Sequence, residues 1–486
     1  MRNHEIFVSL DIGTTSIKVV VAEYINGQIN IIGVGNVKSR GLSRGVIVDI
    51  DETVYSIQQA VTLAEQKSNV KIKEVSVGIP SNKLGLESCH GMIAVSNENR
   101  EITNRDVDNV ITAAKVRSVA PEREIISVIP EEFVVDGFNG IRDPRGMIGV
   151  RLELYATLLT GPRTIIHNIK RCVEKAGLVI KELVLQPQAI AEVALSQDER
   201  EFGTVIIDMG GGQTSASIIY DNQLKYSFVD QEGGDFVTKD ISIILNTSLE
   251  SAERIKREYG YAIASQTSDE EYFPVETVGK KEPVRVDERY LAEIIEARLA
   301  QIFETIHEDL GAVDALDLPG GFVITGGAAS LPGVLELAQK FFGSKVRLFI
   351  PEQMGMRNPV FSTSMGIIEY VAGLDDVHRI AQGTYRPNSR PAQQPEQNHD
   401  ASNDYYPAQP NRQTTQYQRP MSEASPRPER PRANYDQYQQ TNGQENQRYI
   451  ENEYYEEETN QGVYEEPSNE NSVASKVKAF FNTFFD

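Results

Sequence analysis

The chain has 486 residues, 40% of them hydrophobic, which is enough for two or more domains with real cores. Its formal net charge of −22 argues against nucleic-acid binding and against electrostatic adhesion to anionic lipid, so any membrane contact must be apolar and local. The two cysteines, Cys89 and Cys172, predict neither a disulfide framework nor a thiolate metal site. Because the sequence has neither a signal-peptide core nor a run of about 18 apolar residues, we expect a cytoplasmic protein.

The stretch from Phe7 to Val21 has two β-branched runs around a polar turn, which predicts a strand, a hairpin and a second strand. A carboxylate, a glycine, hydroxyls and an ammonium group are suited to a phosphate chain with its metal ion. A solvated hairpin tip is the alternative interpretation of this segment alone. The turn holds Asp11, Gly13, Thr14, Thr15, Ser16 and Lys18.

The next segments predict an α/β domain that is interrupted by an insert. A strand over residues 29–37, a helix preceded by Asp51 and a strand over residues 74–79 continue the α/β pattern. From about residue 84 to 159 the pattern changes to short strands and one helix between Asn104 and Val116. We expect a small α+β insert there.

The opening pattern then occurs a second time. A helix that ends at Gly177 and a short strand precede Gln186, which starts an Ala-rich helix. Residues 204–220 form another predicted strand, turn and strand with Asp208 at the turn. The residues that follow this aspartate in the turn are Gly210, Gly211, Gly212 and Gln213. Two Asp-x-Gly hairpins in one chain indicate a duplicated domain.

The rest of the folded part is mostly helical. Residues 235–259 predict a helical stretch broken near Asn246, and a clean apolar stripe over residues 291–310 predicts a helix packed in the core. Residues 322–333 predict a strand, a glycine-rich turn and a helix start, which offers backbone amides to a ligand. A last helix over residues 366–374 closes the folded part.

The C-terminal region has a different composition. Residues 381–470 contain no Leu or Phe, so they cannot bury enough apolar surface to fold, and we expect a disordered tether. The final residues place apolar side chains on one helical face, which favours a helix lying in the membrane plane or in a partner's groove. The residues of this face are Val473, Val477, Phe480, Phe481, Phe484 and Phe485.

Together, the two hairpins, the helix start between them and the late Thr-Gly-Gly-Ala turn resemble the nucleotide motifs of the actin, heat-shock chaperone and sugar-kinase superfamily. Within it, the chain is similar to the FtsA family of bacterial cell-division proteins, which also have a variable linker and a C-terminal amphipathic helix. The implied fold is α/β, with duplicated actin-like, ribonuclease-H-like domains around a nucleotide cleft and a small α+β insert. The implied divisions are residues 1–83 with 160–195 for the first domain, 84–159 for the insert, 196–232 with 314–380 for the second domain, 233–313 for a smaller subdomain, 381–470 for the linker and 471–486 for the terminal helix.

The resemblance also implies a site for ATP and Mg²⁺. Asp11 and Asp208 would hold the metal ion through water, and Lys18 would supply positive charge. Gln186 would orient the attacking water, but an amide cannot take its proton, so at most slow ATP hydrolysis is expected. The other nucleotide-binding residues implied are Gly13, Thr14, Thr15, Gly210, Gly211, Gly212, Gln213, Gly233, Gly234, Glu253, Lys256, Arg257, Gly326, Gly327, Ala328 and Ser330. For Glu253, Lys256 and Arg257 a solvated helix face is the competing interpretation.

The function implied is that of a self-assembling adaptor. It would bind the C-terminal peptide of FtsZ, other division proteins and membrane lipid, and would tether FtsZ filaments to the cytoplasmic face of the cell membrane at the septum. A pilus-assembly adaptor such as PilM and a small-molecule kinase of the same superfamily are the alternatives. The long tether with its Phe-rich end favours FtsA over both.

Overall fold

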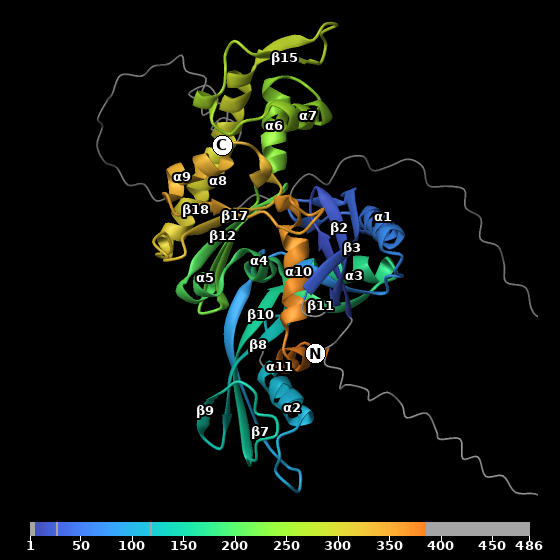
Figure 1. Ribbon diagram of the computed structural model, residues 1–486, viewed down its shortest axis with the longest axis vertical. Coiled ribbons are helices and arrows are strands. Elements are labelled where there is room, and N and C mark those ends of the chain that lie inside the picture. The colour runs from blue at the N-terminus through green and yellow to red at the C-terminus, as the bar shows by residue number, and fades with distance from the viewer. Residues whose placement is uncertain (1–4, 26–27, 117–118, 385–486) are drawn as a thin grey trace, which may run out of the picture. The chain divides into compact units, whose positions relative to one another are not determined.

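Two five-stranded sheets with the same strand order and the same strand directions form the framework of the protein (Figure 1). The computed structural model describes residues 5–25, 28–116 and 119–384, so the predicted linker and terminal helix lie outside the described residues. The first sheet has the order β11-β6-β1-β2-β3, formed by β1 (Glu5–Ile12), β2 (Ser16–Ile25), β3 (Gln28–Lys38), β6 (Glu74–Ile79) and β11 (Val179–Leu185). The second has the order β18-β17-β12-β13-β14, formed by β12 (Thr204–Met209), β13 (Thr214–Tyr220), β14 (Gln223–Asp230), β17 (Phe322–Thr325) and β18 (Val346–Leu348).

The pairing within the two sheets is equivalent. In each sheet three strands are joined as antiparallel hairpins, and two further strands extend the sheet in parallel from the first of them. Such identical topology in one chain confirms the predicted domain duplication.

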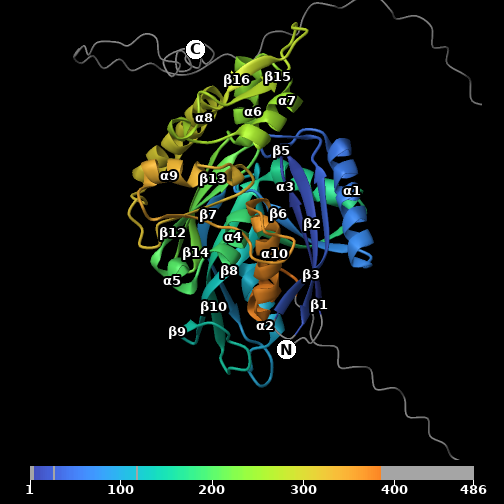
Figure 2. The same cartoon turned by 45° about the horizontal axis from the view of Figure 1, so that its top comes forward.

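Helices cover the first sheet on both faces. Helix α1 (Ile50–Ser68) lies along β2 and β3 (Figure 2), where a side chain at Gly35 would overlap the Ala60 carbonyl oxygen. Its N-cap is Asp49, whose carboxylate accepts a hydrogen bond from the Glu52 amide, so the helix begins at Ile50 and Asp51 lies inside it. Helix α3 (Arg163–Lys175) packs against α1.

A pair of closely packed helices covers the other face. Helix α4 (Gln186–Ala194) contacts α10 (Ser362–Gly373), and a side chain at Gly366 would overlap the Ala189 carbonyl. Buried residues of α10 pack with Phe7 and Val20 of β1 and β2. The division from sequence grouped residues 314–380 with the second domain, whereas the structure places α10 on the first sheet, because its apolar face matches that sheet.

The second sheet is covered by the remaining large helices. The long helix α8 (Glu288–Ala312) is buried along one side and forms a single core with the sheet and the neighbouring helices. These helices and the small hairpin beside them are α6 (Gly234–Ile244), α7 (Leu249–Tyr259), α8 (Glu288–Ala312), α9 (Val334–Phe342), β15 (Tyr272–Val275) and β16 (Val284–Asp287).

The insert is a separate sheet with its own core. It leaves the first domain at Gly85 and returns at Thr160, which are partners across two antiparallel strands. Helix α2 (Asn104–Lys115) packs on this sheet, and its apolar residues contribute to the insert's core. The insert consists of β7 (Gly85–Ala94), α2 (Asn104–Lys115), β8 (Arg123–Val135), β9 (Phe138–Ile141) and β10 (Arg151–Pro162).

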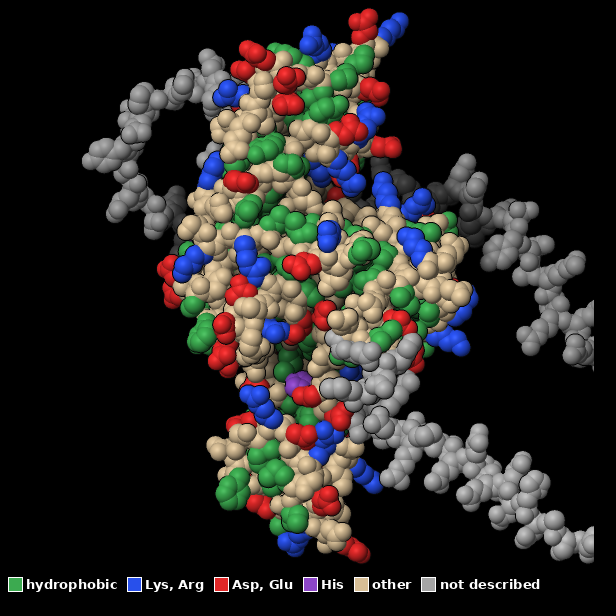
Figure 3. Space-filling model, in the orientation of Figure 1, with side chains coloured by type: hydrophobic (Ala, Val, Ile, Leu, Met, Phe, Trp, Pro, Cys, Tyr) green, Lys and Arg blue, Asp and Glu red, His purple; other side chains and the backbone are tan. Residues whose placement is uncertain are grey.

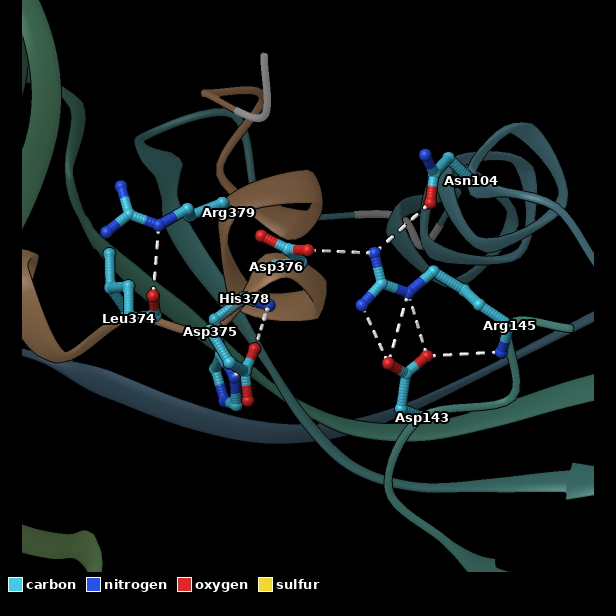
Figure 4. Close-up of polar contacts among 8 residues, drawn as sticks. All are labelled: Asn104, Asp143, Arg145, Leu374, Asp375, Asp376, His378 and Arg379. Atoms are coloured by element: carbon cyan, nitrogen blue, oxygen red, sulfur yellow. Dashed lines mark hydrogen bonds and ion pairs between the residues drawn. The ribbon is translucent and has the colours of Figure 1, made fainter. Parts of the chain in front are cut away.

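The last described helix, α11 (Asp376–Ala381), docks on the insert. Val377 and Ile380 belong to the core of the insert, and Arg145 binds Asp376 at 3.2 Å and Asp143 at 2.7 Å (Figure 4). Arg379 donates hydrogen bonds to the Leu374 and Val371 carbonyls at the end of α10. Helix α11 therefore connects the insert to the helix pair on the first sheet.

The shorter elements connect these parts. They are β4 (Leu42–Ser43), β5 (Val46–Ile47), α5 (Gln197–Phe202) and three 3₁₀ turns at Ala264–Gln266, Ala328–Ser330 and Pro359–Phe361. Within residues 5–384, apart from the gaps, no helix is long and apolar enough to cross a bilayer.

Candidate functional site

The two Asp-x-Gly hairpins have the same turn geometry. The Gly13 amide donates to the Ser16 carbonyl at 3.2 Å, and the Gly210 amide donates to the Gln213 carbonyl at 2.9 Å. Each aspartate is the penultimate residue of the first strand of its hairpin. The duplicated fold thus provides two carboxylates in equivalent positions.

Asp11 is held by two side chains from different elements. Its carboxylate accepts a hydrogen bond from Lys18 at 3.0 Å and from the Gln186 amide at 3.2 Å. Asp11 and Lys18 are both buried, so their opposite charges stabilise each other in a region of low dielectric. The first residue of α4 is thereby connected to the first hairpin.

Asp208 lies close to Asp11. The pKa of Asp208 is raised to about 6, mainly by burial and next by the neighbouring Asp11 carboxylate, while Lys18 opposes both effects. Gly326 has φ +95°, and a side chain there would overlap the Asp208 carboxylate and the Met209 backbone. The predicted glycine-rich turn therefore packs directly on this aspartate.

The two hairpin turns contact each other. Side chains built at Gly211 and Gly212 would overlap Thr15 and Thr14 respectively, so only glycine fits at both positions. Thr14 also accepts a hydrogen bond from the Gly45 amide at 2.9 Å. Residues of the two predicted phosphate turns are thus side by side.

The second turn is supported by the start of α6. The Gly234 amide donates to the Gly210 carbonyl at 3.0 Å, and the Asp235 amide donates to the Gly211 carbonyl at 2.8 Å. A side chain at Gly233 would overlap both of these carbonyls. The structure therefore brings Gly233 and Gly234 to the glycine turn.

The three residues of α7 that the sequence predicts for the site, Glu253, Lys256 and Arg257, have different environments. Lys256 donates to the Gly234 carbonyl at 2.8 Å and to Thr238 at 2.7 Å, and it forms an ion pair with Glu253 at 2.7 Å. Arg257 pairs with the same glutamate, but its side chain is 73% exposed. Lys256 and Glu253 thus support the turn before α6, whereas Arg257 is on the solvated face of the helix.

The loop that follows β17 approaches the same region. Ala328 lies beside Gly234, because a side chain on that glycine would be 3.3 Å from it. Gly327 and Ser330 are exposed, and the Ser330 hydroxyl donates to Asn358 at 3.4 Å. Four predicted elements therefore surround one region of the molecule.

Two polar contacts at this site come from residues without a motif. The Asn82 amide donates to the Gln213 side chain at 2.9 Å, and its buried oxygen has no hydrogen-bond partner in the described part of the chain. Gly45 packs against the same glutamine. Neither residue belongs to a recognisable pattern, although the closely spaced Gly41 and Gly45 indicate a tight turn.

The residues present fit a Mg²⁺-bound nucleoside phosphate. Two neighbouring carboxylates suit a hard cation, and a lysine with several glycine amides suits phosphate oxygens. The glycine positions accept no side chain, so backbone groups can approach a ligand closely. The predicted membrane-binding residues, Val473 to Phe485, lie outside the described residues.

Duplicated sheets with paired Asp-x-Gly hairpins define this chain as an actin-like protein. A chain of the PilM-PilN type IV pilus biogenesis complex has the same fold, with a TM-score of 0.52 and 14% identity over 76% of this chain and 99% of its own.

The family follows from sequence. A family model described as "Cell division protein FtsA" matches residues 205–366, and one described as "SHS2 domain inserted in FTSA" matches residues 82–160. The FtsA of Enterococcus hirae is 59% identical over 382 residues, which cover 79% of this chain and 86% of that protein. The FtsA of Enterococcus faecalis is 57% identical over 411 residues, which cover 84% of this chain and 93% of that protein. The chain therefore belongs to the FtsA family of cell-division proteins.

Proposed function

We propose that this cell-division protein binds ATP with Mg²⁺ between its two Asp-x-Gly hairpins. The observation that carries the proposal is the approach of Asp11 and Asp208 from equivalent strands, with Lys18 beside them. Two carboxylates in one partly buried region repel each other, and a divalent cation relieves that repulsion. Bound Mg²⁺ would neutralise phosphate charge.

The residues around the carboxylates have separate roles in this proposal. Thr14, Thr15 and the amides of the second turn bind the phosphates, and the loop from Gly326 to Ser330 with the Gly233–Gly234 turn binds the adenosine. Lys256 and Glu253 position the Gly233–Gly234 turn, since their polar atoms are engaged within the protein.

Hydrolysis is expected to be slow. Gln186 donates its amide hydrogen to Asp11, and an amide cannot accept a proton from water. The bound nucleotide would therefore serve mainly to set the conformation of the two domains.

The protein would act as an adaptor that polymerises and links FtsZ filaments to the cytoplasmic face of the membrane. The apolar face from Val473 to Phe485 supports the membrane role, and the FtsA family membership supports the division role. The insert has exposed apolar side chains, including Phe138 at 75% and Ile148 at 74%, and hydrophobic patches occupy this region in Figure 3. Such patches suit contacts with other copies or division partners.

Nucleotide binding is tested with the Asp208→Ala variant. We expect Mg-ATP to raise the melting temperature of the wild-type protein and to leave that of the variant unchanged, because half of the cation site is lost. Asp221→Ala, at an exposed turn, is the control and should respond like the wild type. An equal response of Asp208→Ala would refute the site.

Membrane tethering is tested by sedimentation with lipid vesicles, with and without FtsZ. The double variant Phe480→Ser/Phe484→Ser should stay in the supernatant, since burial of each phenylalanine contributes about 1.5–3 kcal/mol. The control Lys476→Ala/Lys478→Ala should still sediment, because apolar insertion dominates in a protein of this charge. Sedimentation of FtsZ with vesicles in the absence of this protein, or with the phenylalanine variant, would contradict the proposal.

A further inference from the structure

A short hairpin of the first domain reaches the first turn of α6 in the second. Strands β4 and β5 are joined by Arg44 and Gly45, which have φ +48° and +73°. Asparagine or glycine is usual at the first of these positions in such a turn, so Arg44 adopts a backbone conformation that its residue type disfavours. The unusual turn presents the Arg44 guanidinium to the ring of Phe236, 5.3 Å from its centroid.

Phe236 is surrounded by cations. Lys239 lies 5.9 Å and Arg298 5.8 Å from the ring centroid. Arg298 is buried and bound to Asp240 at 2.6 Å and Glu232 at 2.6 Å, so it is fixed beneath the ring. Arg44, by contrast, is exposed, and within the described residues it makes no ion pair. Of the three cations, it is the one that comes from the other domain.

Each end of this contact is connected to one of the two hairpin turns of the site. On the first domain, the residue after Arg44 donates its amide hydrogen to Thr14 at 2.9 Å. On the second domain, the residue before Phe236 donates its amide hydrogen to Gly211 at 2.8 Å. A change in the spacing of the two turns therefore changes the distance between the arginine and the ring.

We propose that Arg44 and Phe236 form an interdomain latch that holds the two hairpin turns together around a bound nucleotide. The inference rests on the proposed ATP site. The two residues are positioning residues, because they act through the turns beside them. When the latch opens, the turns separate and the nucleotide leaves.

The latch is tested by measuring release of N-methylanthraniloyl-ATP with Mg²⁺ from the full chain after a chase with ATP. Arg44→Ala and Phe236→Leu should each accelerate release by about two- to fivefold, the range expected for an exposed cation–π contact. Lys239→Ala is the matched control, since it removes a cation from the same ring within one domain, and it should release at the wild-type rate. Arg44→Lys keeps a cation and should release the nucleotide more slowly than Arg44→Ala but faster than the wild type. Phe236→Tyr keeps the aromatic ring and should release it at the wild-type rate.

A double-mutant cycle separates the latch from other roles of the two residues. The variant Arg44→Ala/Phe236→Leu should release no faster than either single variant, because both remove the same contact. If the double variant accelerates release by the product of the two single-variant factors, the residues act independently and the latch is overturned. Equal release rates for Arg44→Ala and Lys239→Ala would also overturn it. If the wild-type protein fails to bind the probe, the proposed nucleotide site itself fails. Binding with unchanged release rates overturns only the latch.

Discussion

At the scale of single residues, the site depends on placing two like charges near each other. Asp11 has Lys18 as a partner, whereas the corresponding position opposite Asp208 is Ser215. The second carboxylate therefore lacks a neighbouring cation on its own hairpin, and burial together with the Asp11 carboxylate raises its pKa to about 6. Ionised Asp208 is thus a cost to folding that a bound cation can offset.

Replacing Asp208 by asparagine should stabilise the protein in metal-free buffer. The pKa of Asp208 is raised in the folded state, so the ionised carboxylate lowers the free energy of unfolding above pH about 6. This destabilisation disappears as the pH falls toward 3.8, the ordinary pKa of an aspartate. We expect Asp208→Asn to increase the free energy of unfolding by about 1–2 kcal/mol at pH 8, a reduced value because the residue is partly solvated. The gain should shrink between pH 6 and pH 4, and Mg-ATP should no longer add stability.

Urea denaturation at several pH values measures this difference. Asp221→Asn, at an exposed turn, is the control and should leave the unfolding free energy unchanged. A destabilised Asp208→Asn variant at pH 8 would contradict a strained carboxylate pair and would indicate that Asp208 is needed for folding.

Single residues also show what could be predicted from the sequence. The hairpin aspartates and glycines form local motifs, so their grouping was predictable before the structure was known. Asn82 and Arg44 belong to elements without a motif, and only the packing of the two domains brings Asn82 to the site and Arg44 to Phe236. Long-range contacts of this kind leave no local signal in one sequence.

At the scale of elements, periodicity predicted the helices and strands that carry strong patterns. Strand β6 has the predicted bounds, and α6 and α7 are separated at Asn246 as expected. Strands β14 and β18 were missed, because short segments with mixed polarity resemble loops. The docking of α10 on the first sheet was also not predictable, since an apolar face does not specify which sheet it covers.

The crossing of α4 and α10 offers a test of this packing. A side chain at Gly366 would overlap the Ala189 carbonyl, so Gly366→Ala should destabilise the protein by about 1–3 kcal/mol despite the better helix propensity of alanine. Gly373→Ala, in the same helix with open space around it, should be neutral or stabilising by up to about 1 kcal/mol. Thermal or urea denaturation measures both changes. Equal changes in the free energy of unfolding for the two variants would contradict the close packing of α4 against α10 at Gly366.

The docking of α11 should depend on Arg145. The planar guanidinium joins Asp143 and Asp376, and these carboxylates raise the pKa of Arg145 above its ordinary value (Figure 4). Arg145→Ala should increase amide exchange in α11 by about three- to tenfold, which corresponds to about 1 kcal/mol of lost docking energy. Arg151→Ala removes another ion pair of the insert, with Glu153, and should leave α11 protected. Unchanged exchange in Arg145→Ala would show that apolar packing alone holds the helix.

At the scale of the whole molecule, the insert is a module attached to a duplicated core. Its chain enters at Gly85 and leaves at Thr160, which face each other across paired strands, and its apolar residues form a core of their own. Helix α11 is its main further contact, through Val377 and Ile380. A short Gly-Ser linker could therefore join the two points without distorting the first sheet.

Replacing residues 86–159 with such a linker should leave the actin-like core folded. Because removal of the insert uncovers the apolar face of α11, the variant also carries Val377→Ser and Ile380→Ser to keep it soluble. We expect a single cooperative unfolding transition and a Mg-ATP-dependent rise in melting temperature equal to that of the complete protein, since the site contains no residue of the insert. The complete protein with only the two serine substitutions is the control. If the control keeps its Mg-ATP response and the shortened protein loses it while remaining folded, the insert contributes to the nucleotide site and is not an independent module.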